Sequence, residues 1–184
     1  MKKIKSVAVY EGKFIRVLNK YFLTDNGKEI IWESVERTNI HNKGAVVIIA
    51  VTKEGEMLFE RNWRAPSEGW VIQFPAGLTD VRGESEEETA RRELLEETGY
   101  RAGRLIPVIV SPLSPDLTPT VATHFFAPDV ELIAKPDRDL AEKIEVIKVP
   151  LAKIAGFLLN LPPDTSLDLR VTGVLWVMEK QRMI

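Results

Sequence analysis

The feature that most constrains this chain is a densely acidic segment between Glu84 and Glu97. It holds seven Glu and two Arg, which leaves a local charge of −5. Residues 84–98 contain few β-branched side chains, many Glu, Arg and Leu, and they are followed at once by Gly99, a typical helix stop. The segment is therefore predicted to form a helix in a chain whose other segments mostly favour strands.

The acidic residues of this helix have two interpretations. A solvated surface helix accounts for Glu84 and for residues 86–88, because negative charge is favourable near a helix N-terminus. Glu93, Glu96 and Glu97 fall within an arc of about 100° near the C-terminus, where the helix dipole disfavours negative charge. Like charges at these spacings cost about 0.2–0.5 kcal/mol each. A bound cation explains this triplet better than solubility does.

The composition narrows the chemistry. The 184 residues are 45% hydrophobic and 28% charged, which is typical of a globular protein. No Cys is present, so thiol catalysis, thiolate zinc sites and disulfides are excluded. The chain has many carboxylates and only two His, and such a set of possible ligands favours Mg²⁺ or Mn²⁺ over zinc. A net charge of −2 argues against a nucleic-acid partner.

The N-terminus predicts no targeting segment. Its first residues are basic but alternate in polarity and reach Glu11 before any long apolar run. We therefore expect neither a signal peptide nor a membrane span, and a soluble cytoplasmic protein.

The N-terminal part of the chain, residues 1–40, is predicted to form a small antiparallel sheet. Residues 4–10, 13–24 and 29–36 favour strands, and Asp25-Asn26-Gly27 is a strong hairpin turn signal. Residues 41–184 are expected to form the main domain.

The main domain is predicted to contain a central hairpin, further strands and a C-terminal helix. The hairpin joins Ala45–Val51 to residues 57–59, and the later strands are expected at 105–111, 121–127 and 144–149. Loops are expected at 111–119 and 134–142. Residues 166–182 indicate a helix capped by Ser166 or its neighbour, with an apolar face of Leu167, Val171, Val174 and Leu175.

The segment from Gly77 to Tyr100 resembles the Nudix box, G-x5-E-x7-R-E-U-x-E-E-x-G-U, where U is a bulky apolar residue. Every fixed position from Glu84 onward is met, and Gly77 lies one residue too far upstream. We interpret this as an insertion in the loop before the helix. The resemblance implies an α+β fold, an α/β/α sandwich in which helices flank a mixed central sheet. It also implies a Mg²⁺-dependent hydrolase of nucleoside diphosphates linked to another moiety.

The resemblance also implies roles for individual residues. Glu93, Glu96 and Glu97 would be metal ligands, together with the backbone carbonyl of Ala76. Arg92 and Glu84 would orient these ligands, since an Arg beside carboxylates keeps them ionised and fixes their rotamers.

The flanking segments 11–38 and 59–80 are similar to ADP-ribose (ADP-sugar) diphosphatases, and Pro115 lies where that subfamily has a characteristic proline. The similarity implies ADP-ribose or a related nucleoside diphosphate sugar as substrate. It also implies a homodimer formed through the N-terminal sheet, in which aromatic residues of one subunit stack on the adenine bound by the other. The matching positions are Trp32 and Phe14, although an aromatic residue on a strand is usually part of a core.

Two arginines match subfamily positions that contact the diphosphate or the terminal ribose. They are Arg37 and Arg64, and a solvated surface arginine is the alternative for each. Gln73 stands where many relatives have Glu.

The general base is implied less directly. Glu142 matches the loop position that supplies a base in this subfamily, and an exposed loop carboxylate is its plain interpretation. Asp116 and Glu96 are alternatives. His124 on its predicted strand favours a structural role, and His41 lies in a polar link.

Two other functions remain open. One is a Nudix hydrolase acting on GDP-mannose or an oxidised nucleotide. The other is a Nudix-like module that binds nucleotides without cleaving them, which is expected to lack box glutamates that this chain retains.

Overall fold

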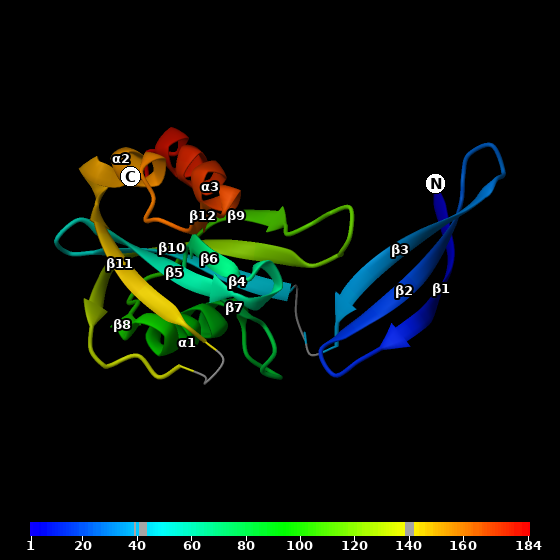
Figure 1. Ribbon diagram of the computed structural model, residues 1–184, viewed down its shortest axis with the longest axis horizontal. Coiled ribbons are helices and arrows are strands. Elements are labelled where there is room, and N and C mark those ends of the chain that lie inside the picture. Colours follow the sequence, from blue (N-terminus) through cyan, green and yellow to red (C-terminus); the bar gives the residue numbers. More distant parts are fainter. Residues whose placement is uncertain (39, 41–43, 139–141) are drawn as a thin grey trace.

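The computed structural model describes residues 1–38, 40, 44–138 and 142–184. Figure 1 shows a three-stranded sheet, β1 to β3, that stands apart from a larger body formed by the rest of the chain. In chain order the described elements are β1 (Lys2–Glu11), β2 (Ile15–Leu23), β3 (Glu29–Arg37), β4 (Gly44–Thr52), β5 (Glu56–Arg64), η1 (Ala65–Ser67), β6 (Gly69–Gln73), β7 (Ala76–Leu78), α1 (Glu86–Thr98), β8 (Tyr100–Arg101), β9 (Ile106–Pro112), β10 (Val121–Leu132), β11 (Ile144–Pro150), η2 (Leu151–Lys153), α2 (Ile154–Leu159), β12 (Thr165–Leu167) and α3 (Leu169–Lys180).

The N-terminal sheet is antiparallel throughout, as the sequence predicts. β2 pairs with β1 on one side and with β3 on the other. The turn between β2 and β3 depends on Gly27, whose φ of +78° suits glycine. The Thr24 carbonyl accepts the Gly27 N–H at 3.0 Å and so closes the turn. Every residue of β1 is exposed.

The main sheet is mixed and has β4 near its middle. β4 pairs in parallel with β10, and antiparallel with β5 and β7. The expected hairpin is confirmed, with Val51 opposite Met57. Strands predicted from the sequence at 105–111, 121–127 and 144–149 are present as β9, β10 and β11.

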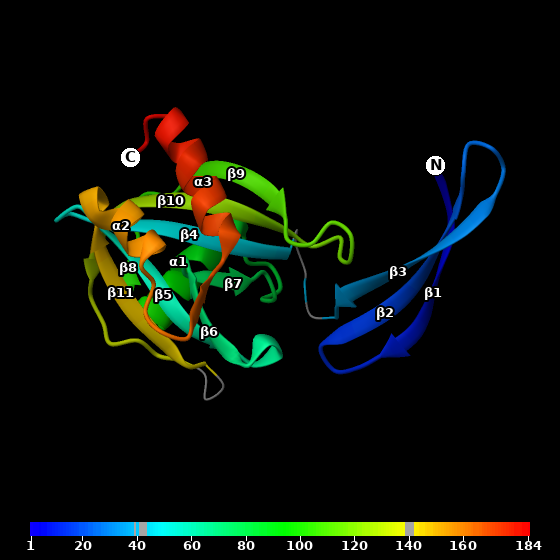
Figure 2. The same cartoon turned by 45° about the horizontal axis from the view of Figure 1, so that its top comes forward.

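The two faces of β4 supply two cores, which makes the molecule a sandwich. Val46, Ile48 and Ala50 pack with Leu94 of α1, whereas their neighbours Val47, Ile49 and Val51 pack on the opposite side with α3. Successive side chains of a strand point to opposite faces, so a central strand covered on both sides is apolar along its whole length. Figure 2 shows α1 on one side of the sheet and α2 with α3 on the other. The predicted α+β sandwich with a mixed central sheet is therefore confirmed.

The acidic helix α1 begins and ends through local chemistry. Ser85 accepts the Glu88 N–H through its side chain, and the Glu88 side chain accepts the Ser85 N–H in return. Gly99 ends the helix with a φ of +79° and donates its N–H to the Leu95 carbonyl. Arg138 donates from Nε to the Glu97 carbonyl at 2.8 Å and so satisfies a carbonyl of the last turn. The helix predicted over 84–98 is confirmed, with its start at Glu86.

The predicted start of the C-terminal helix is wrong. Ser166 and Leu167 belong to β12, which pairs in parallel with β6, and Asp168 is the N-cap of α3. A parallel pairing with a distant strand leaves no local signal, so the sequence could not distinguish it from a helix start. Among the described residues, no helix is both long enough and apolar enough to cross a membrane.

Candidate active site

The site is formed where α1 packs against the short strand β7, and Gly77 makes this contact possible. A Cβ on Gly77 would lie 1.9 Å from Cδ of Glu93, far inside van der Waals contact. Glycine is therefore required for Glu93 to lie over the strand. Gly77 itself lies against the helix, so the insertion predicted from the sequence stays assigned to the loop between Leu78 and Glu84.

Glu97 faces the same strand from the next turn of the helix. Its side chain is buried, and Oε2 accepts the Ala76 N–H at 3.0 Å. The sequence predicts that Ala76 and Glu97 serve one metal site, and the structure brings them together. β7 is held in place by its pairing with β4, in which Ala76 lies opposite Val47.

Arg92 lies among three glutamates. Its Nε donates to Glu84 Oε1 at 3.0 Å, and Nη1 donates to Glu93 Oε1 at 2.8 Å and to Glu96 Oε2 at 3.0 Å. The hydrogen bond from Arg92 lowers the pKa of Glu84, and the same glutamates raise the pKa of Arg92. Among the residues that the structure describes, no three acidic or histidine side chains converge closely enough to hold a metal ion as they stand. Arg92 holds Glu93 and Glu96 instead.

Ionisation of the carboxyl groups at the α1–β7 junction is unfavourable because these groups are buried and lie close to one another. Burial raises the pKa of Glu93 to about 7, despite the neighbouring Arg92. Burial also raises the pKa of Glu97 well above its ordinary value, and the charges of Glu60 and Glu93 raise it further. Burial raises the pKa of Glu60 to about 7, and its Oε1 has no hydrogen-bond partner among the described residues. A divalent cation would offset this crowding, so the donor set fits such an ion.

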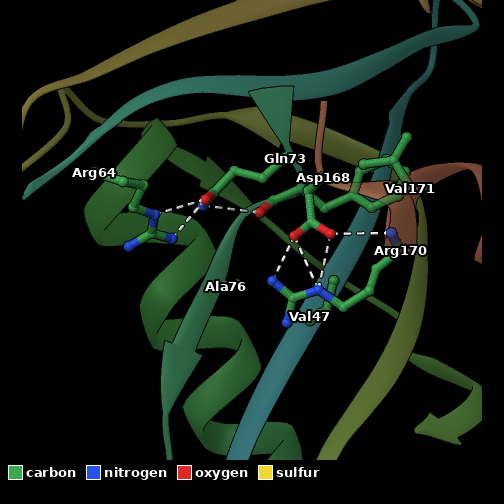
Figure 3. A pocket seen from close by; sticks show the side chains of 8 residues that line it. Val47, Arg64, Gln73, Ala76, Asp168, Arg170 and Val171 are labelled. Atoms are coloured by element: carbon green, nitrogen blue, oxygen red, sulfur yellow. Dashed lines mark hydrogen bonds and ion pairs between the residues drawn. The ribbon is translucent and has the colours of Figure 1, made fainter. Parts of the chain in front are cut away.

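A cavity of about 30 Å³ adjoins Ala76 on the other side of β7, and Figure 3 shows its lining. Arg64 donates from Nε to Gln73 Oε1 at 2.9 Å, and Gln73 Nε2 donates to Glu60 Oε2 at 3.2 Å. The lining residues are Val47, Arg64, Gln73, Phe74, Ala76, Asp168, Arg170 and Val171. Arg170 is paired with Asp168, to which its Nε donates at 2.9 Å, so Arg64 is the guanidinium in this lining that has no carboxylate partner among the described residues. A guanidinium beside a strand of the candidate site suits an anionic ligand.

Comparisons with known proteins identify the family of this chain and relatives that share its sequence or its fold. The family described as "NUDIX domain" matches residues 41–166. The chain belongs to the Nudix family. An "ADP-ribose pyrophosphatase" of Bacillus subtilis is 32% identical over 151 residues, covering 82% of this chain and 78% of the relative. A solved structure described as "Crystal structure of ADP compounds hydrolase" has a TM-score of 0.81 and 23% identity, covering 98% of this chain and 94% of that one, and so shares the fold.

A further relative bears on substrate choice for this Nudix hydrolase. A "GDP-mannose pyrophosphatase" of Yersinia enterocolitica is 28% identical over 148 residues, covering 74% of this chain and 75% of the relative. Relatives of this Nudix chain therefore include proteins named for different nucleoside diphosphate sugars.

The residues expected to bind substrate lie at two places in the Nudix chain. Trp32 donates from Nε1 to the Asp116 carbonyl at 2.9 Å, so it lies beside the loop that also carries Pro115. Phe14, in the turn between β1 and β2, and Arg37, at the end of β3, are exposed, whereas Arg64 is beside the cavity at β7. The structure brings Trp32 to the Pro115 loop and Arg64 to the strand of the Nudix box glycine.

The three candidates for the general base lie on different segments. Glu142 is exposed just before β11, next to Lys143, whose carbonyl accepts the Trp63 N–H at 2.9 Å. Asp116 accepts the Ser114 hydroxyl at 2.9 Å, and Glu96 is held by Arg92. The assignment of Glu142 stays a prediction.

His124 is buried on β10, and burial lowers its pKa. Its Nδ1 has no hydrogen-bond partner among the described residues, and a structural role stays the prediction. His41 lies outside the described residues.

Sequence reasoning missed several groups near the Nudix box. Glu60, on β5, Arg138, in the loop after β10, and Asp168 with Arg170, at the start of α3, are distant in sequence from Glu97 and reach the site region through the tertiary fold. The available signal for Glu60 was an ionisable residue directly after the apolar residues 57–59 of a predicted central strand.

Proposed function

We propose that this protein is a Mg²⁺-dependent hydrolase of the diphosphate bond in ADP-ribose or a related nucleoside diphosphate sugar. The products would be a nucleoside monophosphate and a sugar phosphate. Relatives named ADP-ribose pyrophosphatase and ADP-sugar pyrophosphatase support this substrate class, the latter a mouse protein that is 32% identical over 99 residues.

One observation carries the proposal. Glu97 and Glu93 of α1 lie against Ala76 and Gly77 of β7, with burial that raises the pKa of both carboxyl groups. Burying two acidic side chains side by side against strand β7 costs free energy unless a cation offsets their charge. A cation at this place could grip the paired phosphates of a substrate.

The residues that would hold Mg²⁺, with Mn²⁺ as a substitute, are Glu93, Glu96, Glu97 and the carbonyl of Ala76. When bound, such an ion would neutralise negative charge on the diphosphate and lower the pKa of the attacking water. For Glu93 and Glu96 to face it, the Arg92 bonds of 2.8 and 3.0 Å have to rearrange. Arg92 stays anchored by Glu84, so it can orient the ligands from behind.

The remaining roles concern the substrate. Arg64 and Arg37 would bind the diphosphate or terminal ribose, because a guanidinium offers a fork of donors to phosphate oxygens. Glu142 would accept a proton from the attacking water. Its place in a loop before β11 allows it to approach the substrate without repacking of the sheet.

We also propose that residues 1–40 form a dimerising unit and residues 41–184 the catalytic unit. The strands of the N-terminal sheet and the turn between β1 and β2 expose large apolar side chains: Ile4, Val7, Val9, Tyr10, Phe14, Ile31 and Trp32. Apolar exposure on this scale suits burial against a second copy of the chain. Trp32 and Phe14 would then stack on adenine, with Pro115 in the neighbouring loop.

The test is hydrolysis of a nucleotide-sugar panel that includes ADP-ribose and GDP-mannose, with Mg²⁺ and with a chelator. We expect ADP-ribose to be cleaved fastest, in a metal-dependent reaction that Glu97→Gln abolishes. GDP-mannose is the second candidate because of the Yersinia relative. Ligand binding without turnover by the unaltered protein would indicate a binding module instead.

A further inference from the structure

Glu60 is a carboxylate in an unusual place. It lies on β5 inside the main sheet with no exposed surface. Gln73, its cross-strand partner on β6, donates Nε2 to Glu60 Oε2 at 3.2 Å. The other oxygen, Oε1, has no hydrogen-bond partner among the described residues. A buried carboxylate with one oxygen unsatisfied is costly, so its presence requires an explanation.

The side chain next to Glu60 is Glu97. The carboxyl groups of Glu60 and Glu97 interact with one another. Glu97 uses Oε2 to accept the Ala76 N–H at 3.0 Å. Their contact places one buried acid directly behind another that faces β7.

The nearby cations do not pair with Glu60. Arg64 directs its donors to Gln73 Oε1. Arg138 directs its donors to the carbonyls of Glu97 and Ile144. The charges of both arginines act on Glu60 and lower its pKa. Neither arginine forms an ion pair with Glu60 within the part of the chain that the structure describes, so this carboxylate can still attract a cation.

We propose that Glu60 is a positioning residue of the cation site, which adds negative charge behind Glu97 and holds that carboxylate toward a divalent ion at the α1–β7 junction. The inference rests on the proposed function, since it assigns a further residue to the same site. Gln73 fixes Glu60 through its amide, and Arg64 fixes Gln73 in turn. Outer residues that orient ligands in this way commonly change metal affinity by about 10- to 100-fold.

The test measures Mn²⁺ binding by the full chain without substrate, from the electron paramagnetic resonance signal of free Mn²⁺ at pH 8. Glu60→Gln keeps the shape of the side chain and removes the carboxylate. Glu60→Val replaces it with an apolar side chain suited to a buried strand. We expect the Mn²⁺ dissociation constant to rise about 10- to 100-fold in both variants.

Thermal unfolding of the ion-free variants separates positioning from a structural role. Replacing a buried charge by an apolar side chain is often neutral or stabilising, so we expect the Tm of Glu60→Val to be no lower than that of the unaltered protein. Glu56→Gln is the matched control, because Glu56 lies on the same strand and pairs with Lys148 at 2.9 Å, away from α1. It should leave Mn²⁺ affinity unchanged.

An unchanged Mn²⁺ dissociation constant in either folded Glu60 variant overturns the inference. So does a fall in Tm without a change in affinity, which would make Glu60 purely structural. If Mn²⁺ binding weakens as expected but the unaltered protein cleaves no nucleoside diphosphate sugar, the proposed function is wrong and the positioning role stands. If the protein cleaves such substrates while Glu60→Val binds Mn²⁺ normally, only the positioning role is wrong.

Discussion

Replacing Gly77 by alanine should disable the site while leaving the fold intact. A Cβ at this position would lie 1.9 Å from Cδ, 2.2 Å from Cγ and 2.3 Å from Oε1 of Glu93. Carbon atoms in favourable contact are about 3.5–4.0 Å apart. The Glu93 carboxyl group therefore has to move by roughly 1.5–2 Å to make room for the methyl group.

The size of the effect follows from what has to move. The atoms in conflict form the end of a flexible side chain, so we expect a loss of unfolding free energy at the low end of the about 1–3 kcal/mol typical of overpacking. A misplacement of about 1 Å can cost about 100-fold in rate. We therefore expect kcat/KM for the preferred nucleotide sugar to fall by at least about 100-fold, or about 2.7 kcal/mol of transition-state stabilisation.

The assay combines steady-state hydrolysis, Mn²⁺ titration and thermal unfolding of the same preparation. Gly103→Ala is the control, since a Cβ there meets no atom within 4 Å among the described residues. If Gly77→Ala retained the kcat/KM and Mn²⁺ affinity of the unaltered protein, the assignment of Glu93 to the site would be refuted.

Three further predictions address the ligands, the pH dependence and the substrate. Arg92→Lys loses the fork that joins Glu84 to Glu93 and Glu96, so kcat/KM should fall about 10- to 100-fold with little change in Tm. An unchanged kcat/KM would contradict its orienting role. Burial raises the pKa of Glu93 from 4.5 to about 7, so its contribution to stability is complete below pH 4.5 and is lost as the pH rises through 7. Urea unfolding of the ion-free protein should show a loss of stability over this interval, of which roughly 3 kcal/mol comes from Glu93 and is absent in Glu93→Gln; the buried carboxyl groups of Glu60 and Glu97, whose pKa values are also raised, account for a loss that the variant retains. An identical pH profile in the variant would exclude Glu93 as a source. Trp32→Ala should raise KM for ADP-ribose about 5- to 160-fold with kcat retained, as expected from about 1–3 kcal/mol of lost stacking. An unaltered KM would place adenine elsewhere.

Local chemistry along the chain was sufficient to predict α1 and its acidic face. Ser85, Glu88 and Gly99 form hydrogen bonds with backbone groups only a few residues away, so the two ends of the helix are determined by the local sequence. The helical period then places Glu93 and Glu97 on one side without any knowledge of the fold. The N-terminal sheet was predictable for the same reason, because a glycine turn joins two adjacent strands.

The partners of that face were decided by the tertiary structure. Gly77 lies under Glu93 because β7 pairs with β4, and Glu60 meets Gln73 because β5 pairs with β6. The parallel pairing of β12 with β6 likewise moved the start of α3 past Ser166. Pairing between distant strands depends on how both faces of the sheet are buried in the complete fold. A short stretch of sequence does not contain this information. The sequence of a single helix was therefore enough to predict the candidate acidic ligands, whereas the packing of the sheet determined which buried groups surround them.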